Sequence, residues 1–216
     1  VLDRLDDDLP LVIVGHSLGG LLTQKILERR NADLGVLLAS IPPQGIFRSF
    51  RRIAKAFPAP ARRMILRLNL MAAMDPEVVN YLLFSNRIDA AQFTRYSNRL
   101  SAESLWVFVR ALGPLFARPH RVASPIEVVG SNADHGVSQE EVEQTALAYG
   151  VIPHILDGIG HDMMLDPDWK GVAQTVEGLI ENHLQIQPAA PTADPVQLAP
   201  ALQSIASSLA SGVAVT

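Results

Sequence analysis

Residues 11–24 read LVIVGHSLGGLLTQ, and this stretch decides the fold class. It begins with the continuous apolar run Leu11–Val14, which is typical of a parallel strand covered on both faces. A turn with three glycines around Ser17 follows, and Leu18–Arg30 is predicted to form a helix. A strand, a tight turn and a helix in direct succession indicate an α/β fold with a parallel sheet.

The turn GHSLG, residues 15–19, matches the pattern G-x-S-x-G, and Gly20 extends it. In such a turn the serine takes a strained backbone conformation that lifts its hydroxyl above the sheet. We expect Gly15 and Gly19 to keep Cβ atoms out of the space where strand and helix nearly collide. The N–H of Leu18, at the start of the helix, would point toward a developing oxyanion. The alternative is a glycine-rich turn without chemistry.

The rest of the chain continues the alternation of strands and helices. Further strands are predicted at Val36–Ala39, Ile126–Val129 and Ile152–Leu156. The capping box Ser138–Glu141 opens a helix that Gly150 can close. A last amphipathic helix is predicted within Asp168–Leu184.

A helical insertion is predicted between the second and third strands. Its helices are expected at Ile46–Phe57, Arg62–Met74, Pro76–Phe84 and Ala102–Leu112, with Asp75 and Ser101 at N-cap positions. Residues 46–121 hold thirteen Lys and Arg against four Asp and Glu, although the whole chain of 216 residues has a net charge of −4. This positive charge could favour an anionic substrate or an anionic membrane surface. We favour the simpler interpretation that the arginines form the solvated faces of amphipathic helices.

The segment Met64–Met74 of this insertion is strongly apolar and holds three methionines. Methionine side chains adapt to varied shapes, so the segment suits a wall that binds acyl chains. It is equally typical of a helix buried against its neighbours.

A serine nucleophile needs a base, and the base needs an acid to orient it. His161 follows the last predicted strand and a glycine, which places it on the same edge of the sheet as Ser17. Asp134 follows the strand Ile126–Val129, whereas the loop after Val36–Ala39 holds no carboxylate. We therefore predict Ser17 as nucleophile, His161 as base and Asp134 as acid. The alternative for Asp134 is an aspartate that only caps its loop.

The other histidines fit the role of base less well. His135 is the rival, but it would be held away from the carboxylate of its own neighbour, Asp134. His16 lies inside the turn and is expected to point elsewhere. Three more lie within a predicted strand or away from strand ends: His154, His120 and His183.

The order serine, aspartate, histidine along the chain resembles that of the α/β-hydrolase superfamily. The resemblance rests on GHSLGG at residues 15–20, GSNAD at 130–134 and GHDMM at 160–164, and it covers about residues 5–184. It implies a hydrolase core with a helical cap, similar to the caps of lipase-, esterase- and lysophospholipase-like members.

The domains that the resemblance implies are residues 1–45 and 122–184 for the core, and 46–121 for the cap. Residues 185–216 are rich in Ala, Pro, Ser and Gln, and they are predicted to form a disordered tail.

The resemblance implies a serine hydrolase that cleaves carboxylic esters. Ser17 would form an acyl-enzyme, His161 would transfer the proton, Asp134 would orient the imidazole, and the Leu18 N–H would be half of the oxyanion hole. It implies no metal or organic cofactor, and a small ester or acyl substrate rather than nucleic acid. Two alternatives stay open. The same residues could act on thioester, amide, peptide or C–C bonds, or the chain could be a non-catalytic binding protein on a hydrolase scaffold.

Members of the superfamily normally place four strands before the serine turn, with a loop that supplies the second oxyanion donor. Nothing before Leu11 resembles them, so we expect a fragment that is weak or inactive alone. The absence of cysteine excludes disulfides and suits a reducing compartment. No run of eighteen apolar residues predicts a membrane span, and no signal peptide is visible, so we expect a cytoplasmic location.

Overall fold

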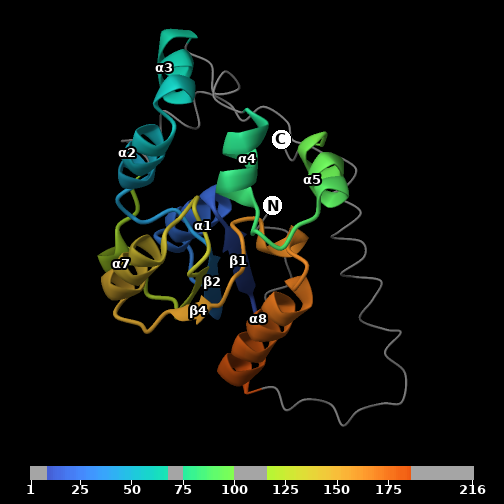
Figure 1. Ribbon diagram of the computed structural model, residues 1–216. Helices are drawn as coiled ribbons and strands as arrows, with labels where there is room; N and C mark the ends of the chain where they lie inside the picture. The colour runs from blue at the N-terminus through green and yellow to red at the C-terminus, as the bar shows by residue number, and fades with distance from the viewer. Residues whose placement is uncertain (1–8, 68–74, 100–115, 186–216) are drawn as a thin grey trace, which may run out of the picture. The chain divides into compact units, whose positions relative to one another are not determined.

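The computed structural model of the protein describes residues 9–67, 75–99 and 116–185 (Figure 1). All its elements lie in one compact unit, residues 1–184. In chain order they are β1 (Val12–His16), α1 (Leu18–Leu27), β2 (Leu34–Leu38), α2 (Phe47–Ala56), α3 (Pro58–Arg67), α4 (Pro76–Leu83), α5 (Ala90–Ser97), the 3-10 turn η3 (Pro119–Arg121), β3 (Ile126–Ser131), α7 (Gln139–Tyr149), β4 (His154–Leu156), the 3-10 turn η4 (Met163–Leu165) and α8 (Trp169–Leu184).

The four strands form a parallel sheet in the order β1-β2-β3-β4. Val14 lies opposite Val36, Leu37 opposite Val128, and Val129 opposite His154. Every residue of β2 is buried. The parallel sheet confirms the predicted α/β class, and it places the loops that follow β1, β3 and β4 at one edge.

Helices cover both faces of the sheet, with α7 and α8 on opposite sides (Figure 1). Two clusters of buried hydrophobic residues form the core, one on each face of the sheet. Successive side chains of a strand point to opposite faces, so Val36 packs in the first cluster and Leu37 in the second. The first cluster includes Val172 of α8, and the second includes Leu27 of α1 and Val142 of α7. Because both faces are covered, β2 consists of apolar residues and glycine throughout.

The sequence predicted most of the helix ends to within a few residues. The first helix ends at Leu27, three residues before the predicted Arg30. The capping box of Ser138 and Glu141 is present, and Gly150 ends α7 with a φ of 69°. That left-handed conformation explains why a glycine stands there.

The inserted helices α2 to α5 lie between β2 and β3 in the chain, and two of them differ from the prediction. Helix α3 begins at Pro58 rather than Arg62, because proline is well tolerated in a first turn. Helix α5 was not predicted, although a capping box of Asp89 and Gln92 opens it. Asp75 stands at the N-cap of α4 as predicted, but its carboxylate caps no described N–H of that helix.

The Asp75 carboxylate instead pairs with Arg63 of α3.

Several predicted features lie outside the described residues: the helix at 102–112 with its N-cap Ser101, residues 68–74 of the methionine-rich segment, and the tail from residue 186 onward. Within the described ranges, no helix is both long and apolar enough to cross a membrane.

Candidate active site

The turn between β1 and α1 holds Ser17 in a backbone conformation that non-glycine residues rarely adopt, with a φ of 52° and a ψ of −117°. The Ser17 N–H donates to the Leu38 carbonyl at 3.0 Å. The Ser17 carbonyl accepts from the N–H groups of Gly20 at 3.1 Å and Ile41 at 3.0 Å. Bonds to the end of β2 and to the chain just beyond it therefore stabilise the strained turn.

Two of the three glycines are required by close packing. A Cβ on Gly15 would lie 2.3 Å from Thr23 Oγ1, and a Cβ on Gly20 would lie 2.3 Å from Ser40 Oγ. At Gly19 a Cβ would meet no described atom within 4 Å. The expected steric role of Gly19 was therefore wrong, because the crowded face of α1 begins one residue later, at Gly20.

We expect Gly20→Ala to lower the free energy of unfolding by about 1–3 kcal/mol. The new Cβ would lie 2.4 Å from the Cβ of Ser40, which is buried and accepts a hydrogen bond from Gln24. Gly19→Ala is the matched control, and it should leave stability unchanged or raise it slightly, since alanine favours a helix. Urea unfolding followed by circular dichroism measures both variants. Equal losses in the two would contradict this packing argument.

Hydrogen bonds join Ser17, His161 and Asp134. His161 Nε2 lies 2.9 Å from Ser17 Oγ, and His161 Nδ1 lies 2.8 Å from Asp134 Oδ2. The side chains of His161 and Asp134 are 7% and 0% exposed. The structure therefore brings together the three residues that the sequence singled out. Ser17 follows β1, Asp134 follows β3 and His161 follows β4.

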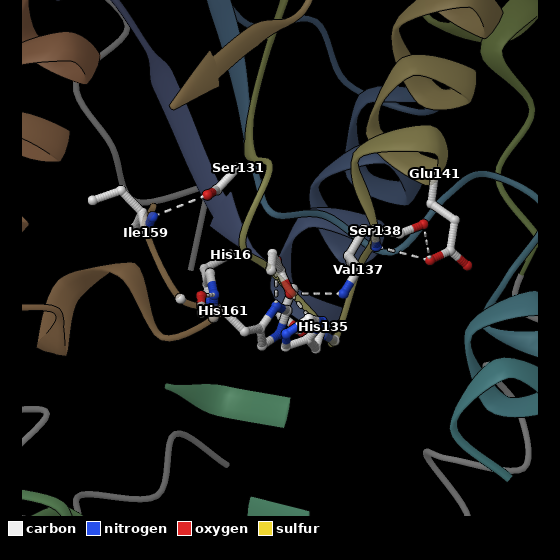
Figure 2. Close-up of polar contacts among 12 residues, drawn as sticks. His16, Ser131, His135, Val137, Ser138, Glu141, Ile159 and His161 are labelled. Carbon is white, nitrogen blue, oxygen red and sulfur yellow. Dashed lines mark hydrogen bonds and ion pairs between the residues drawn. The ribbon is translucent and has the colours of Figure 1, made fainter. Parts of the chain in front are cut away.

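The second oxygen of the Asp134 carboxylate binds the backbone of its own loop. Asp134 Oδ1 accepts from the N–H of Gly136 at 2.7 Å and of Val137 at 2.9 Å, and Figure 2 labels Val137 beside this contact. A Cβ on Gly136 would lie 2.9 Å from the ring of His161, so a glycine is needed there for the loop to close on the imidazole. Hydrogen bonds therefore hold both oxygens of Asp134, and Oδ2 stays directed at His161 Nδ1.

Burial and the nearby charges shift the pKa values of His161 and His16 in opposite directions. Burial opposes the charged form of His161, but the Asp134 carboxylate, with a smaller effect of Asp162, raises the pKa of His161 above its usual range. Burial, followed by repulsion from His161, lowers the pKa of His16 to about 4. Near neutral pH, His16 is thus uncharged, and His161 is the imidazole suited to hold an extra proton.

His16 lies beside His161 and not elsewhere as expected from the sequence (Figure 2). Its Nε2 is 2.9 Å from the backbone carbonyl of His161, and the two ring centroids are 4.9 Å apart. The expectation was wrong because the loop after β4 folds over the end of β1. A neutral His16 that donates from Nε2 therefore helps to fix the loop that carries His161.

Ser131 at the end of β3 also fixes that loop, and sequence reasoning missed it. Its buried Oγ accepts from the N–H of Ile159 and of Ala133, both at 3.1 Å, and Figure 2 shows the first of these bonds. A lone serine that ends an apolar strand was the available signal.

The remaining histidines have other contacts. The ring of His135 stacks on Tyr81 of α4, with centroids 4.1 Å apart and planes 5° apart. In the described part of the chain, no hydrogen bond joins the His135 ring to Ser17, so the rival base is not at the serine. His154 begins β4 and pairs with Glu127, while the last two lie in η3 (His120) and near the end of α8 (His183).

A cavity of about 180 Å³ reaches Ser17 and His161 and is lined by residues of α2, α3 and α4. Apart from Ser49 and the residues around Ser17, the residues that line the cavity are apolar, with Ile53, Phe57 and Met64 among them. Ser49 also lines the cavity, but its hydroxyl donates to Glu141 of α7 at 2.6 Å. Among the described residues, no group of three or more His, Cys, Asp or Glu is placed to hold a metal ion.

Comparisons with known proteins agree with this architecture. A family model described as the alpha/beta hydrolase family matches residues 1–175. No curated protein sequence matches the chain.

Solved structures give fold-level similarity. A candidate lipase from Acinetobacter baumannii AYE is 19% identical with a TM-score of 0.57, over 82% of this chain and 62% of that one. Polyneuridine aldehyde esterase is 15% identical with a TM-score of 0.58, over 82% and 74% of the two chains. Proline iminopeptidase from Mycobacterium smegmatis is 14% identical with a TM-score of 0.52, over 82% and 67%. This chain thus spans less than two thirds of the first protein.

Proposed function

Because this chain belongs to the alpha/beta hydrolase family, we propose that it is a serine hydrolase that cleaves carboxylic esters with uncharged, apolar acyl groups. The observation that carries the proposal is the hydrogen-bond chain from Ser17 through His161 to Asp134, which meets an apolar cavity at the serine. A serine, a base and an acid in that contact are the set that acyl transfer requires.

In the proposed reaction, Ser17 Oγ attacks the ester carbonyl while His161 Nε2 takes the hydroxyl proton. The tetrahedral intermediate collapses, the C–O bond of the ester breaks, and His161 returns the proton to the departing alcohol. Water then attacks the acyl-enzyme while His161 Nε2 takes one of its protons, the bond between the acyl carbon and Ser17 Oγ breaks, and His161 returns the proton to Ser17 as the carboxylic acid leaves. We assign the Leu18 N–H, at the N-terminus of α1, as one donor to the oxyanion. Asp134 stabilises the imidazolium form of His161.

The cavity supports an apolar acyl group over an aminoacyl one. The family and its fold host peptidases as well as esterases, so the fold by itself does not fix the bond. The residues that line the described cavity include no carboxylate that could bind a substrate ammonium group. Moving an unpaired charge into such a cavity is unfavourable, whereas an alkyl chain gains from leaving water.

A substrate panel tests the proposal. The octanoyl group is kept constant as an ester, a thioester and an anilide, and prolyl anilide is added as the aminoacyl comparison. We expect the highest kcat/KM for an octanoyl substrate, with the ester ahead of the anilide. Faster cleavage of prolyl anilide would overturn the proposed acyl preference, and faster cleavage of the octanoyl anilide would overturn the proposed bond.

We expect Ala54→Phe to reduce kcat/KM for an octanoyl ester at least tenfold and to leave an acetyl ester nearly unaffected. Ala54 of α2 lines the cavity, and a phenyl ring there would displace the end of a long chain. Excluding two methylenes costs about 1.6 kcal/mol, or about 15-fold. Steady-state kinetics on both esters measures the effect.

Ala56→Phe is the matched control, because Ala56 lies two residues further on the same helix and is exposed. This variant should behave like the wild type on both esters. An equal loss on acetyl and octanoyl esters in the Ala54→Phe variant would show that the cavity does not bind the acyl chain.

A further inference from the structure

Arg52 of α2 contacts the loop that carries Asp134. Its Nη1 donates to the His135 carbonyl at 2.6 Å, and its Nη2 lies 3.1 Å from the Gly136 carbonyl. The same Nη2 also pairs with Glu141 Oε2 of α7 at 3.0 Å. The guanidinium thus bonds to the peptide segment whose Gly136 N–H binds Asp134.

Arg87, which follows α4, contacts the loop that carries His161. Its Nη2 pairs with Asp166 Oδ1 at 3.0 Å, and Asp166 Oδ2 accepts from the N–H of Gly160 at 3.1 Å. The Asp162 N–H donates to the carbonyl of Leu83, the last residue of α4, at 2.8 Å. Both neighbours of His161 in the chain are therefore held by the inserted segment. The Asp162 N–H is bound directly, and the Gly160 N–H is bound through the Asp166 carboxylate.

The carboxylates in these two contacts are buried and need their partners. The side chain of Glu141 is 5% exposed and that of Asp166 is 1% exposed, so an unpaired charge at either would be costly. Burial opposes ionisation of Glu141, but bonds from Ser49, the Ser138 N–H and Arg52 lower its pKa below the usual value. Figure 2 shows the Ser138–Glu141 contact.

We propose that Arg52 and Arg87 are positioning residues for the reaction, each tying one part of the inserted helices to one of the two loops that carry Asp134 and His161. The inserted helices would then serve two purposes, since they line the cavity and also hold the acid and the base in register. The inference rests on the proposed function only for its effect on turnover. The rigidity of the two loops can be measured without any substrate.

The two arginines differ in a way that separates positioning from a general effect of charge. Arg52 reaches three acceptors at once, two carbonyls and one carboxylate, which the fork of a guanidinium allows and a lysine ammonium does not reproduce. In the described part of the chain, the guanidinium of Arg87 bonds to one carboxylate oxygen, Asp166 Oδ1, and a lysine ammonium can make the same bond. Lysine should therefore restore function at position 87 and fail to restore it at position 52.

The experiment compares Arg52→Met, Arg52→Lys, Arg87→Met and Arg87→Lys with the control Arg48→Met. Arg48 lies one turn earlier on α2, is 66% exposed, and stands 3.9 Å from an exposed glutamate. Hydrogen exchange by mass spectrometry is measured on residues 131–138 and 158–166, together with kcat and KM on an acetyl ester, which probes the reacting groups rather than the cavity.

We expect Arg52→Met to speed exchange in residues 131–138, and Arg87→Met to speed exchange in residues 158–166. Each should lower kcat by about 10–10²-fold, as small misplacements of reacting groups do, with KM nearly unchanged. Arg87→Lys should recover most of the lost kcat, and Arg52→Lys little of it. Arg48→Met should match the wild type in every measurement.

Glu141→Gln provides a second route to the contact of Arg52 if the methionine variant does not fold. Glutamine still completes the capping box with Ser138 but removes the charge that pairs with the guanidinium. It should speed exchange in residues 131–138 as Arg52→Met does.

If hydrogen exchange in the two loops is no faster in Arg52→Met and Arg87→Met than in the Arg48→Met control, the proposal is overturned, whether or not the wild type cleaves esters. A loss confined to KM, or full recovery by Arg52→Lys, would also overturn it. If the wild type lacks turnover but loop exchange responds as expected, the proposed ester hydrolysis fails and the positioning contacts stand.

Discussion

The Ser17→Ala variant is expected to lose ester turnover almost completely, with a fall in kcat of about 10⁶-fold. Ser17 Oγ is the atom that His161 Nε2 contacts at 2.9 Å, and alanine offers no oxygen to attack a carbonyl. Alanine takes the same strained backbone conformation at about the same cost as serine, so the fold should be retained. Intact-mass spectrometry after treatment with a fluorophosphonate gives the direct readout: the probe should add to the wild type and not to the variant.

His161→Ala and the double variant Ser17→Ala/His161→Ala are the controls for this result. Residues that act as one unit have non-additive effects, so the double variant should be about as slow as either single variant. Labelling that persists in Ser17→Ala would place the nucleophile elsewhere. A folded wild type that neither labels nor turns over any ester would support the alternative of a binding protein on a hydrolase scaffold.

Asp134→Asn should lower kcat by about 10⁴-fold with little change in structure. The N–H groups of Gly136 and Val137 both donate to Asp134 Oδ1, so the amide oxygen of asparagine must stay on that side. The amide NH₂ would then face His161 Nδ1, which favours the tautomer with its proton on Nε2. An imidazole in that state donates toward Ser17 and cannot take its proton.

The pH dependence of the same variant provides a second check. Asp134 raises the pKa of His161, Asp162 adds to the effect, and the nearby ring of His16 is uncharged near neutral pH. The base works only in its neutral form, so kcat/KM falls as the pH falls through the pKa of His161. Without the carboxylate that pKa is lower, so the acidic limb of the profile should move to lower pH. An unmoved limb in Asp134→Asn would show that Asp134 does not set the protonation of the base.

Sequence alone predicted the elements of the fold whose signals are local. The run Leu11–Val14, the turn at Ser17 and the capping box at Ser138 each lie within a few consecutive residues, and each formed close to where it was expected. The meeting of Asp134 with His161 could also be predicted, because parallel strands bring their following loops to one edge of the sheet.

Contacts between distant segments could not be predicted in this way. Arg52 and His135 are 83 residues apart in the chain, and His16 and His161 are 145 apart, so no periodic pattern links them. The steric role given to Gly19 failed for a related reason: only the positions of the atoms show which of two adjacent glycines faces Ser40. Short-range patterns fix the elements, whereas the contacts that hold the site depend on how those elements pack.

The inserted helices leave the sheet after β2 and return to it before β3, so their length and sequence can change in evolution without altering the order of the strands. Such an insertion would be an exchangeable module if it only shaped the cavity. The bonds of Arg52 and Arg87 to the loops beside Asp134 and His161 remove that freedom. A segment transplanted from a relative would bring its own pocket, but it would also have to place an arginine at each of these two positions. New substrate preferences would then arise more readily by point substitutions, such as those at Ala54, than by exchange of the whole segment.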